Sequence, residues 1–230
     1  MKIKIYEILL LPILVIACYI VISAVVSTRQ TVDRVVQNSP VRHYDSIVRL
    51  VDHDSGKTFC SGTVISDTII VTAGHCVVEM NPILQALGHG LRMEPIDIRT
   101  DKNKDLGVQA RAVWATPQLD QGVLQGDFRK FEHSPYTTDI QTILDERFNN
   151  KSLLSCGYPM GGHLFCTKFL YDDTDAFSWE GTGILLPGMS GGPVLTEDGK
   201  VIAVNVAVEG NKSIVSPIYN INENFPKDSK

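Results

Sequence analysis

Short runs of β-branched and apolar residues, separated by turn residues, fill most of the chain from Ser46 onward. Two of the separating turns are the polar, glycine-containing stretches 54–57 and 197–200. The runs occupy residues 47–51, 62–65, 68–71, 96–99, 108–114, 181–185, 193–195 and 201–208. Many short strands at this spacing are typical of a barrel or a sandwich, so the pattern predicts an all-β fold.

The length of 230 residues suits one domain of ordinary size, or two small lobes that share a core. Residues 134–151 are less apolar and contain a Ser-Pro pair, so we interpret them as a link between two lobes, with a short helix over 140–148. The expected folded domain then covers residues 45–222. Its division is a first lobe at about 45–133, the link 134–151, a second lobe at about 152–222 and a tail at 223–230.

Residues 8–26 contain no charged side chain, and as a helix they would span about 28 Å, close to the thickness of the hydrocarbon core of a bilayer. Lys2 and Lys4 precede this segment, which favours an amino terminus inside and the remaining chain outside. We interpret residues 1–27 as an uncleaved signal-anchor and 28–44 as a tether. A cleaved signal peptide and a lipoprotein signal ending at Cys18 are the alternatives, and a buried core helix fits the length and position poorly. All three membrane interpretations place the domain on the extracytoplasmic side, either anchored or secreted.

The cysteine count agrees with export. Cys18 lies in the apolar segment, and the four others lie in the expected domain, where an even number fits two disulfides in an oxidising compartment. The net charge of −5 contains no basic excess that would indicate nucleic-acid binding.

Two short motifs indicate nucleophilic catalysis. Ser190 lies in the run Gly-Met-Ser-Gly-Gly-Pro over 188–193, where glycines allow a tight turn that aims the N–H groups of Gly188 and Ser190 at one point, as an oxyanion hole requires. His75 ends the run Thr-Ala-Gly-His over 72–75, directly after an apolar strand. Each motif alone also fits a glycine-rich turn or a structural histidine. Together, in this order, they resemble the two signature motifs of the trypsin/chymotrypsin family over roughly residues 45–222.

The resemblance implies a double β-barrel in which His75 is the general base for Ser190. Cys60 and Cys76 are 16 residues apart, as in the family's histidine-loop disulfide, so the resemblance implies a Cys60–Cys76 bridge. We expect Cys156 and Cys166 to join adjacent strands. A zinc site that includes His163 is the competing interpretation, but its spacing matches no common zinc pattern. We expect no metal and no cofactor.

The acid of the triad is the least constrained member. The family places it between the histidine and the serine, at the start of a strand and before an apolar residue. Asp127 and Asp105 both qualify. A hairpin is needed between the histidine loop and the acid, and the segments 96–99 and 108–114 supply it, with Asp105 in its turn. This count favours Asp127, although Arg129 and Lys130 follow it where the family has small and apolar residues.

Departures from the family pattern constrain activation and specificity. Met189 stands where zymogens of the family have an aspartate, so we expect no activation switch of that type. The positions that select a charged residue before the cut hold Ile184 and Asn205, which predicts cleavage of protein or peptide substrates after small or aliphatic residues. The pocket residues implied by the resemblance are Ile184, Asn205, Val206, Ala207 and Val208. A catalytically silent binding module of the same fold and a membrane-anchored structural component are the alternative functions.

Overall fold

The structure is a computed structural model that describes residues 44–79, 90–102, 107–149, 153–174 and 178–218. The predicted membrane segment 8–26 and the predicted tether and tail lie outside these residues. Within the described ranges, no helix has both the length and the apolar character needed to cross a bilayer.

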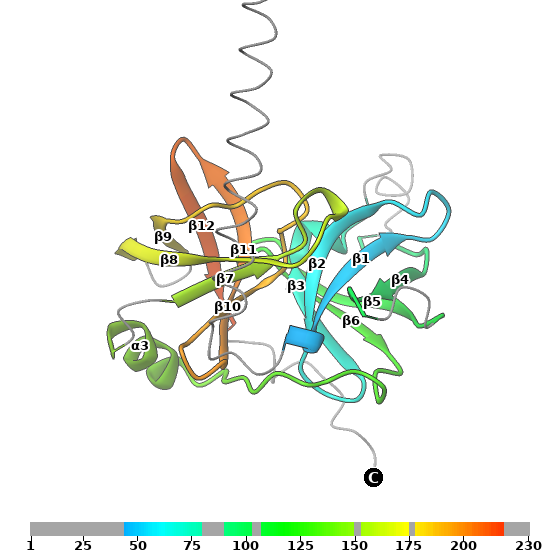
Figure 1. Cartoon of the computed structure of the whole chain (residues 1–230), viewed down its shortest axis with the longest axis horizontal. Coiled ribbons are helices and arrows are strands. Elements are labelled where there is room, and N and C mark those ends of the chain that lie inside the picture. Colours follow the sequence, from blue (N-terminus) through cyan, green and yellow to red (C-terminus); the bar gives the residue numbers. More distant parts are fainter. Residues whose placement is uncertain (1–43, 80–89, 103–106, 150–152, 175–177, 219–230) are drawn as a thin grey trace, which may run out of the picture. The chain divides into compact units, whose positions relative to one another are not determined.

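The amino-terminal lobe is a closed antiparallel barrel with the strand order β1-β2-β3-β6-β5-β4 (Figure 1). The pairing of β1 with β4 closes it, with Arg49 opposite Arg99 and Asp52 opposite Ile96. Its strands are β1 (Ile47–Asp52), β2 (Thr58–Val64), β3 (Ile69–Ala73), β4 (Ile96–Arg99), β5 (Gln109–Thr116) and β6 (Gln121–Gly126).

The carboxyl-terminal lobe is a second closed barrel with the order β10-β11-β12-β9-β8-β7. The pairing of β7 with β10 closes it, with Val194 opposite Ser155. Its strands are β7 (Leu153–Gly157), β8 (Phe165–Thr174), β9 (Trp179–Thr182), β10 (Pro193–Leu195), β11 (Val201–Glu209) and β12 (Lys212–Pro217). The expected all-β double barrel is therefore confirmed.

Each barrel is filled by the inward-facing residues of its strands. In β4 the burial alternates along the strand, because successive side chains point to opposite faces. The first core contains Leu50, Ile70, Ile98, Leu124 and Phe128, all with at most 1% of their surface exposed. Four of them come from β1, β3, β4 and β6, and Phe128 follows β6, so these segments close around one core.

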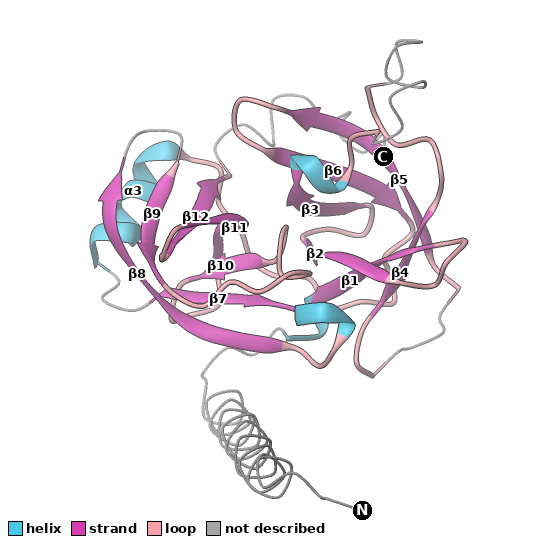
Figure 2. Cartoon of the chain, turned by 90° about the horizontal axis from the view of Figure 1, so that it is seen from above, coloured by secondary structure: helices cyan, strands magenta, loops and turns pink. Residues whose placement is uncertain are grey.

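The two barrels also share packed side chains. Ile47, Ile65, Val71 and Val123 belong to the first barrel but pack in the buried cluster of the second. Figure 2 shows the two sets of strands side by side, with β3 and β11 at their junction. This junction brings the end of β3 close to the loop that precedes β10, and these are the segments that carry the His75 and Ser190 motifs.

The chain passes between the barrels through residues 127–152, which contain the helix α3 (Ile140–Asn149). The short helix predicted over 140–148 is thus confirmed. Before it, Tyr136 forms a parallel bridge with Val201, and the Val201 N–H donates to the carbonyl of Pro135. The link is therefore attached to the second barrel before the helix begins.

Candidate active site

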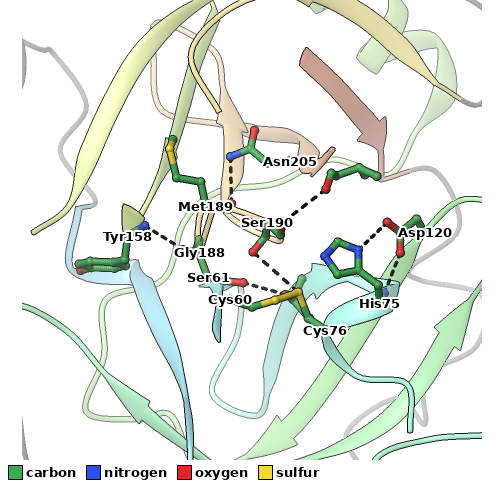
Figure 3. The surroundings of a disulfide bond; sticks show 12 residues. Cys60, Ser61, His75, Cys76, Asp120, Tyr158, Gly188, Met189, Ser190 and Asn205 are labelled. Atoms are coloured by element: carbon green, nitrogen blue, oxygen red, sulfur yellow. Dashed lines mark hydrogen bonds and ion pairs between the residues drawn. A yellow bond between two sulfur atoms is a disulfide. The ribbon is translucent and has the colours of Figure 1, made fainter. Parts of the chain in front are cut away.

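The loop that carries Ser190 is held from the first barrel by one buried residue, Ser61 of β2. The Ser61 N–H donates to the Ser190 carbonyl at 2.8 Å, and its hydroxyl donates to the Gly188 carbonyl at 2.7 Å. The same hydroxyl accepts the N–H of Tyr158 at 2.9 Å (Figure 3). Ser61 therefore fixes both sides of the nucleophile loop and the start of the turn beside it. The sequence marks Ser61 only as the residue after Cys60, and its role requires the contact between the two barrels.

The backbone around Ser190 depends on its glycines. Gly188 has φ +93° and Gly191 has φ +79°, a region that other L-residues rarely adopt. A side chain at Gly188 would lie 2.7 Å from the Tyr158 carbonyl oxygen, so glycine is also required by space. Among the hydrogen bonds between described residues, none uses the N–H of Gly188 or of Ser190. These two predicted oxyanion donors are therefore not paired with any residue that the structure describes.

His75 lies in the short 3-10 helix η2 (Gly74–Cys76), which follows directly after β3. The disulfide between Cys60 and Cys76 is present, with 6.1 Å between the Cα atoms, and it ties this turn to β2. In Figure 3 the His75 ring lies between Ser190 and Asp120. The His75 side chain is 44% exposed, so a reactant can approach it from solvent.

Asp120, which neither sequence motif includes, is the acid beside His75. One carboxylate oxygen lies 2.7 Å from the His75 ring nitrogen Nδ1, and the other accepts the His75 backbone N–H at 2.7 Å. Asp120 ends the turn between β5 and β6, with φ +46°. A side chain at position 74 would lie 2.9 Å from the Asp120 carboxylate, so the glycine before His75 leaves room for this contact.

The prediction that Asp127 lies beside His75 is wrong. Strands β3 and β6 are antiparallel, with Ala73 opposite Gln121 and Ile69 opposite Gln125. Asp120 precedes β6 at the end next to His75, whereas Asp127 follows β6 at the far end, about 20 Å away along a six-residue strand.

Asp127 is instead 63% exposed and paired with Arg129, whose Nε lies 2.8 Å from the carboxylate. The hydrogen bond from the Arg129 side chain lowers the pKa of Asp127 to about 2. The alternative residue Asp105 lies outside the described residues.

The Ser190 hydroxyl donates to the Val206 carbonyl of β11 at 3.4 Å, and no hydrogen bond joins it to His75 in the described part of the chain. Catalytic hydrogen bonds are often long without substrate and tighten when substrate binds. Serine, histidine and aspartate therefore lie in the order that base catalysis needs, with the serine hydroxyl turned toward β11.

The predicted specificity residues separate into two groups. Asn205 is fully buried, and its amide nitrogen donates to the Cys156 carbonyl at 2.8 Å and the Met189 carbonyl at 3.3 Å, while its oxygen accepts from the Ser155 hydroxyl. The expectation that Asn205 lines a substrate pocket is therefore wrong, because its polar atoms are occupied inside the second barrel.

The other predicted pocket residues lie toward solvent. Val206 is half-buried and Ala207 is exposed, while Val208 is 52% and Ile184 is 51% exposed. Ser213 connects them, because it pairs with Val208 on one side and its hydroxyl donates to the Gly183 carbonyl on the other. Ser213 therefore lies between Val208 of β11 and the segment that leads to Ile184.

The second disulfide joins Cys156 and Cys166, which face each other on the adjacent strands β7 and β8. Both expected bridges are thus present. His75 lies near the sulfur atoms of Cys60 and Cys76, but these sulfurs are bonded to each other and cannot act as thiolate ligands for a metal. The two disulfides also indicate that the domain folds in an oxidising, extracytoplasmic compartment.

Comparison with known proteins agrees with this geometry. Residues 60–204 match the family described as "Trypsin-like peptidase domain", and this range includes both motifs and Asp120. A comparison with curated protein sequences gives no match.

Solved structures share the double barrel. The serine endoprotease from Yersinia pestis is 17% identical, with a TM-score of 0.58, and the match covers 76% of this chain and 60% of that one. The Rv3671c protease from M. tuberculosis, in its active form, is 17% identical with a TM-score of 0.54 and 76% of each chain covered. The HtrA-type protease AlgW, solved with a decapeptide, is 14% identical with a TM-score of 0.54, and 76% of this chain and 62% of that one are covered. The chain thus spans about 60% of the length of the Yersinia protein, and likeness at these identities concerns the fold.

Proposed function

Because the chain belongs to the trypsin-like peptidase family, we propose that it is a serine endopeptidase with Ser190 as nucleophile, His75 as general base and Asp120 as the acid that orients the base. The observation that carries this proposal is the pair of 2.7 Å contacts between Asp120 and His75, next to the nucleophile loop. Two groups on one residue, the ring and the backbone N–H, are held by the same carboxylate, so the imidazole has little freedom to turn away.

The proposed reaction follows from these positions. The His75 Nε2 takes the proton of the Ser190 hydroxyl as the oxygen attacks the scissile carbonyl, and the resulting tetrahedral oxyanion accepts from the Gly188 and Ser190 N–H groups. His75 then gives the proton to the amine as the C–N bond breaks, which leaves an acyl ester on Ser190. A water molecule, deprotonated by His75, attacks the ester and releases the acid and the serine hydroxyl. Throughout the reaction the Asp120 carboxylate accepts a hydrogen bond from the His75 Nδ1–H and stabilises the charged ring.

The loop conformation supports activity without a trypsin-style zymogen switch. Met189 is fully buried where such a switch would need a carboxylate, and the Gly157 backbone lies against it, so that a side chain at position 157 would overlap it. Ser61 and Asn205 hold the carbonyl groups of residues 188–190 by hydrogen bonds from both barrels. The loop is therefore organised by contacts that need no newly freed amino terminus.

Labelling with a fluorophosphonate probe tests the proposal. We expect wild-type protein to be labelled at Ser190, with Ser190→Ala unlabelled and equally stable to heat. A silent binding module of the same fold, or a purely structural component, would leave the wild-type protein unlabelled and would refute the assignment. Mass spectrometry of the labelled peptide identifies the modified residue.

The apolar side chains of Ile184, Val206 and Val208, which lie toward solvent, support cleavage after small or aliphatic residues. We expect kcat/KM for peptides with Ala or Val before the cut to exceed that for Arg, Lys or Glu by about tenfold, because an apolar side chain gains contact with these apolar groups and a charged side chain finds no partner among them. A peptide library read by mass spectrometry measures this ratio. Preferred cleavage after Arg, Lys or Glu would contradict it.

We also propose that the apolar segment 8–26 holds the peptidase domain at a membrane, on the extracytoplasmic side, unless it is removed as a signal peptide. The absence of charge over this segment and the two disulfides of the domain support this arrangement. Mass spectrometry of the mature amino terminus distinguishes the anchored from the secreted form.

A further inference from the structure

A cationic cavity of about 500 Å³ lies where the start of β2 meets the turn Pro159–Gly161. Thr58 lines it from β2, and Met160 and Gly161 line it from the turn. Its three charged lining residues are all positive, namely Arg49, Lys57 and Arg99.

The three cations differ in how far contacts within the fold neutralise their charges. Arg49 and Arg99 are direct cross-strand partners where β1 closes the barrel on β4, and like charges in that position destabilise a sheet. Asp101 pairs with Arg49 and Asp97 with Arg99, so these two charges are balanced from outside the cavity. Lys57 is exposed, and among the described residues it takes part in none of the ion pairs. One uncompensated positive charge and two further guanidinium groups therefore face the cavity, an environment that favours an anion.

The cavity adjoins the proposed active site through a single turn. The Met160 N–H donates to the Pro187 carbonyl at 2.7 Å, directly before Gly188, and Arg49 donates to the Gly161 carbonyl at 3.3 Å. Met160 is 84% exposed and has φ +51°, so the turn presents its outer side to solvent at the edge of the cavity. The cations thus lie one backbone turn away from the oxyanion donors.

The direction of the substrate chain relates this cavity to the scissile bond. In the proposed mechanism we assign the acyl half to the β11 side of Ser190, where the Val206 carbonyl lies 3.4 Å from the Ser190 hydroxyl. The amine half leaves past His75, which must protonate it. On that side a hollow of about 240 Å³ is lined by His75, Cys76, Val78 and Phe59, and by the charged residues Glu79, Arg92 and Glu94, of which Arg92 pairs with Glu94. Phe59 is adjacent to Thr58, so a chain that crosses Phe59 at about 3.3 Å per residue reaches the cationic cavity within a few residues.

We propose that the cavity lined by Arg49, Lys57 and Arg99 binds an acidic side chain of the substrate, two to four residues after the cleaved bond. This inference rests on the proposed endopeptidase function and specifies its substrate class: proteins that carry Asp or Glu on the leaving side of the cut.

Paired peptides test the inference. They share one acyl half and differ only in having Asp or Lys at the second to fourth positions after the cut. We expect the full-length protein to cleave the acidic peptide with kcat/KM about fivefold higher, mainly through a lower KM, since an exposed ion pair supplies an effect of this size. Lys57→Glu should abolish or reverse the preference. Lys130→Glu, an equal change of charge at an exposed residue near Asp127, should leave it unchanged.

The other possible results of these experiments either overturn the inference or overturn the proposed function. Equal cleavage of the two peptides by an active enzyme overturns the inference and leaves the peptidase function standing. Faster cleavage of a neutral peptide when a separate acidic peptide is added, without a preference within the substrate, also overturns it. If no peptide is cleaved and Ser190 is not labelled, the proposed function fails. Independently of cleavage, fluorescence anisotropy of the acidic leaving-half peptide with Ser190→Ala protein tests whether the cavity binds an acidic side chain: binding that is lost when Lys57→Glu is added supports the inference, and no binding overturns it.

Discussion

Asp120→Asn is expected to lower kcat by about four orders of magnitude with little change in KM. The asparagine can still accept the His75 backbone N–H, as Asp120 Oδ1 does at 2.7 Å, so the turn should keep its shape. Its amide cannot stabilise a charged imidazole, and it allows the tautomer with the proton on the wrong nitrogen. Steady-state hydrolysis of a peptide measures the loss, and thermal unfolding checks that the variant folds.

Asp127→Asn provides the matched control, because it makes the same chemical change at the other end of β6. Asp127 is 63% exposed and contacts Arg129 rather than His75, so we expect kcat within about twofold of wild type. A large loss in Asp127→Asn together with an active Asp120→Asn would reverse the assignment of the acid. A similar loss in both variants would indicate that neither contact acts in the way proposed.

Residue spacing alone does not identify the aspartate that lies beside His75. Strand β6 has the sequence Gln-Gly-Val-Leu-Gln-Gly, in which only Val123 and Leu124 have a strong β-type character, so this strand was absent from the predicted pattern. Without it, the turn that ends at Asp120 could not be placed beside β3. The antiparallel pairing of β3 with β6 then determines which aspartate lies beside His75. Asp120, before β6, lies next to the residues that follow β3, whereas Asp127, after β6, lies at the other end of the strand.

Local motifs were more informative where the chemistry is local. The motifs around Ser190 and His75 each occupy a few residues of sequence, and the two disulfides join cysteines only 16 and 10 residues apart. The pocket role predicted for Asn205 is wrong, and no sequence pattern indicates the role of Ser61. Their roles come from contacts with residues 16 to 127 positions away, which no local pattern records. The sequence therefore predicts the reacting groups better than the residues that position them.

Gly191→Ala is expected to lower the free energy of unfolding by about 4 kcal/mol or more, because a left-handed backbone and an overpacked core each contribute a cost. Gly191 has φ +79°. A Cβ there would overlap the Thr72 hydroxyl and the Ser61 carbonyl, and it would lie 2.8 Å from the Ala73 N. These atoms belong to strands β2 and β3, which cannot move apart without breaking the 2.7 Å hydrogen bond from the Thr72 hydroxyl to the Ser61 carbonyl. Urea unfolding followed by tryptophan fluorescence measures the change.

Gly210→Ala separates the cost of the left-handed backbone from the cost of overpacking. Gly210 also has a left-handed backbone, with φ +62°, but a Cβ there meets no atom within 4 Å. We expect this variant to lose only about 1 kcal/mol, the cost of the backbone conformation alone. Equal losses in the two variants would mean that the nucleophile loop is free to move away from β2 and β3. In that case Ser61 does not hold Ser190 in place, and Gly191→Ala should retain most of its activity. A much larger loss at Gly191, together with slow labelling of Ser190, is the outcome expected if the junction between the barrels fixes the nucleophile.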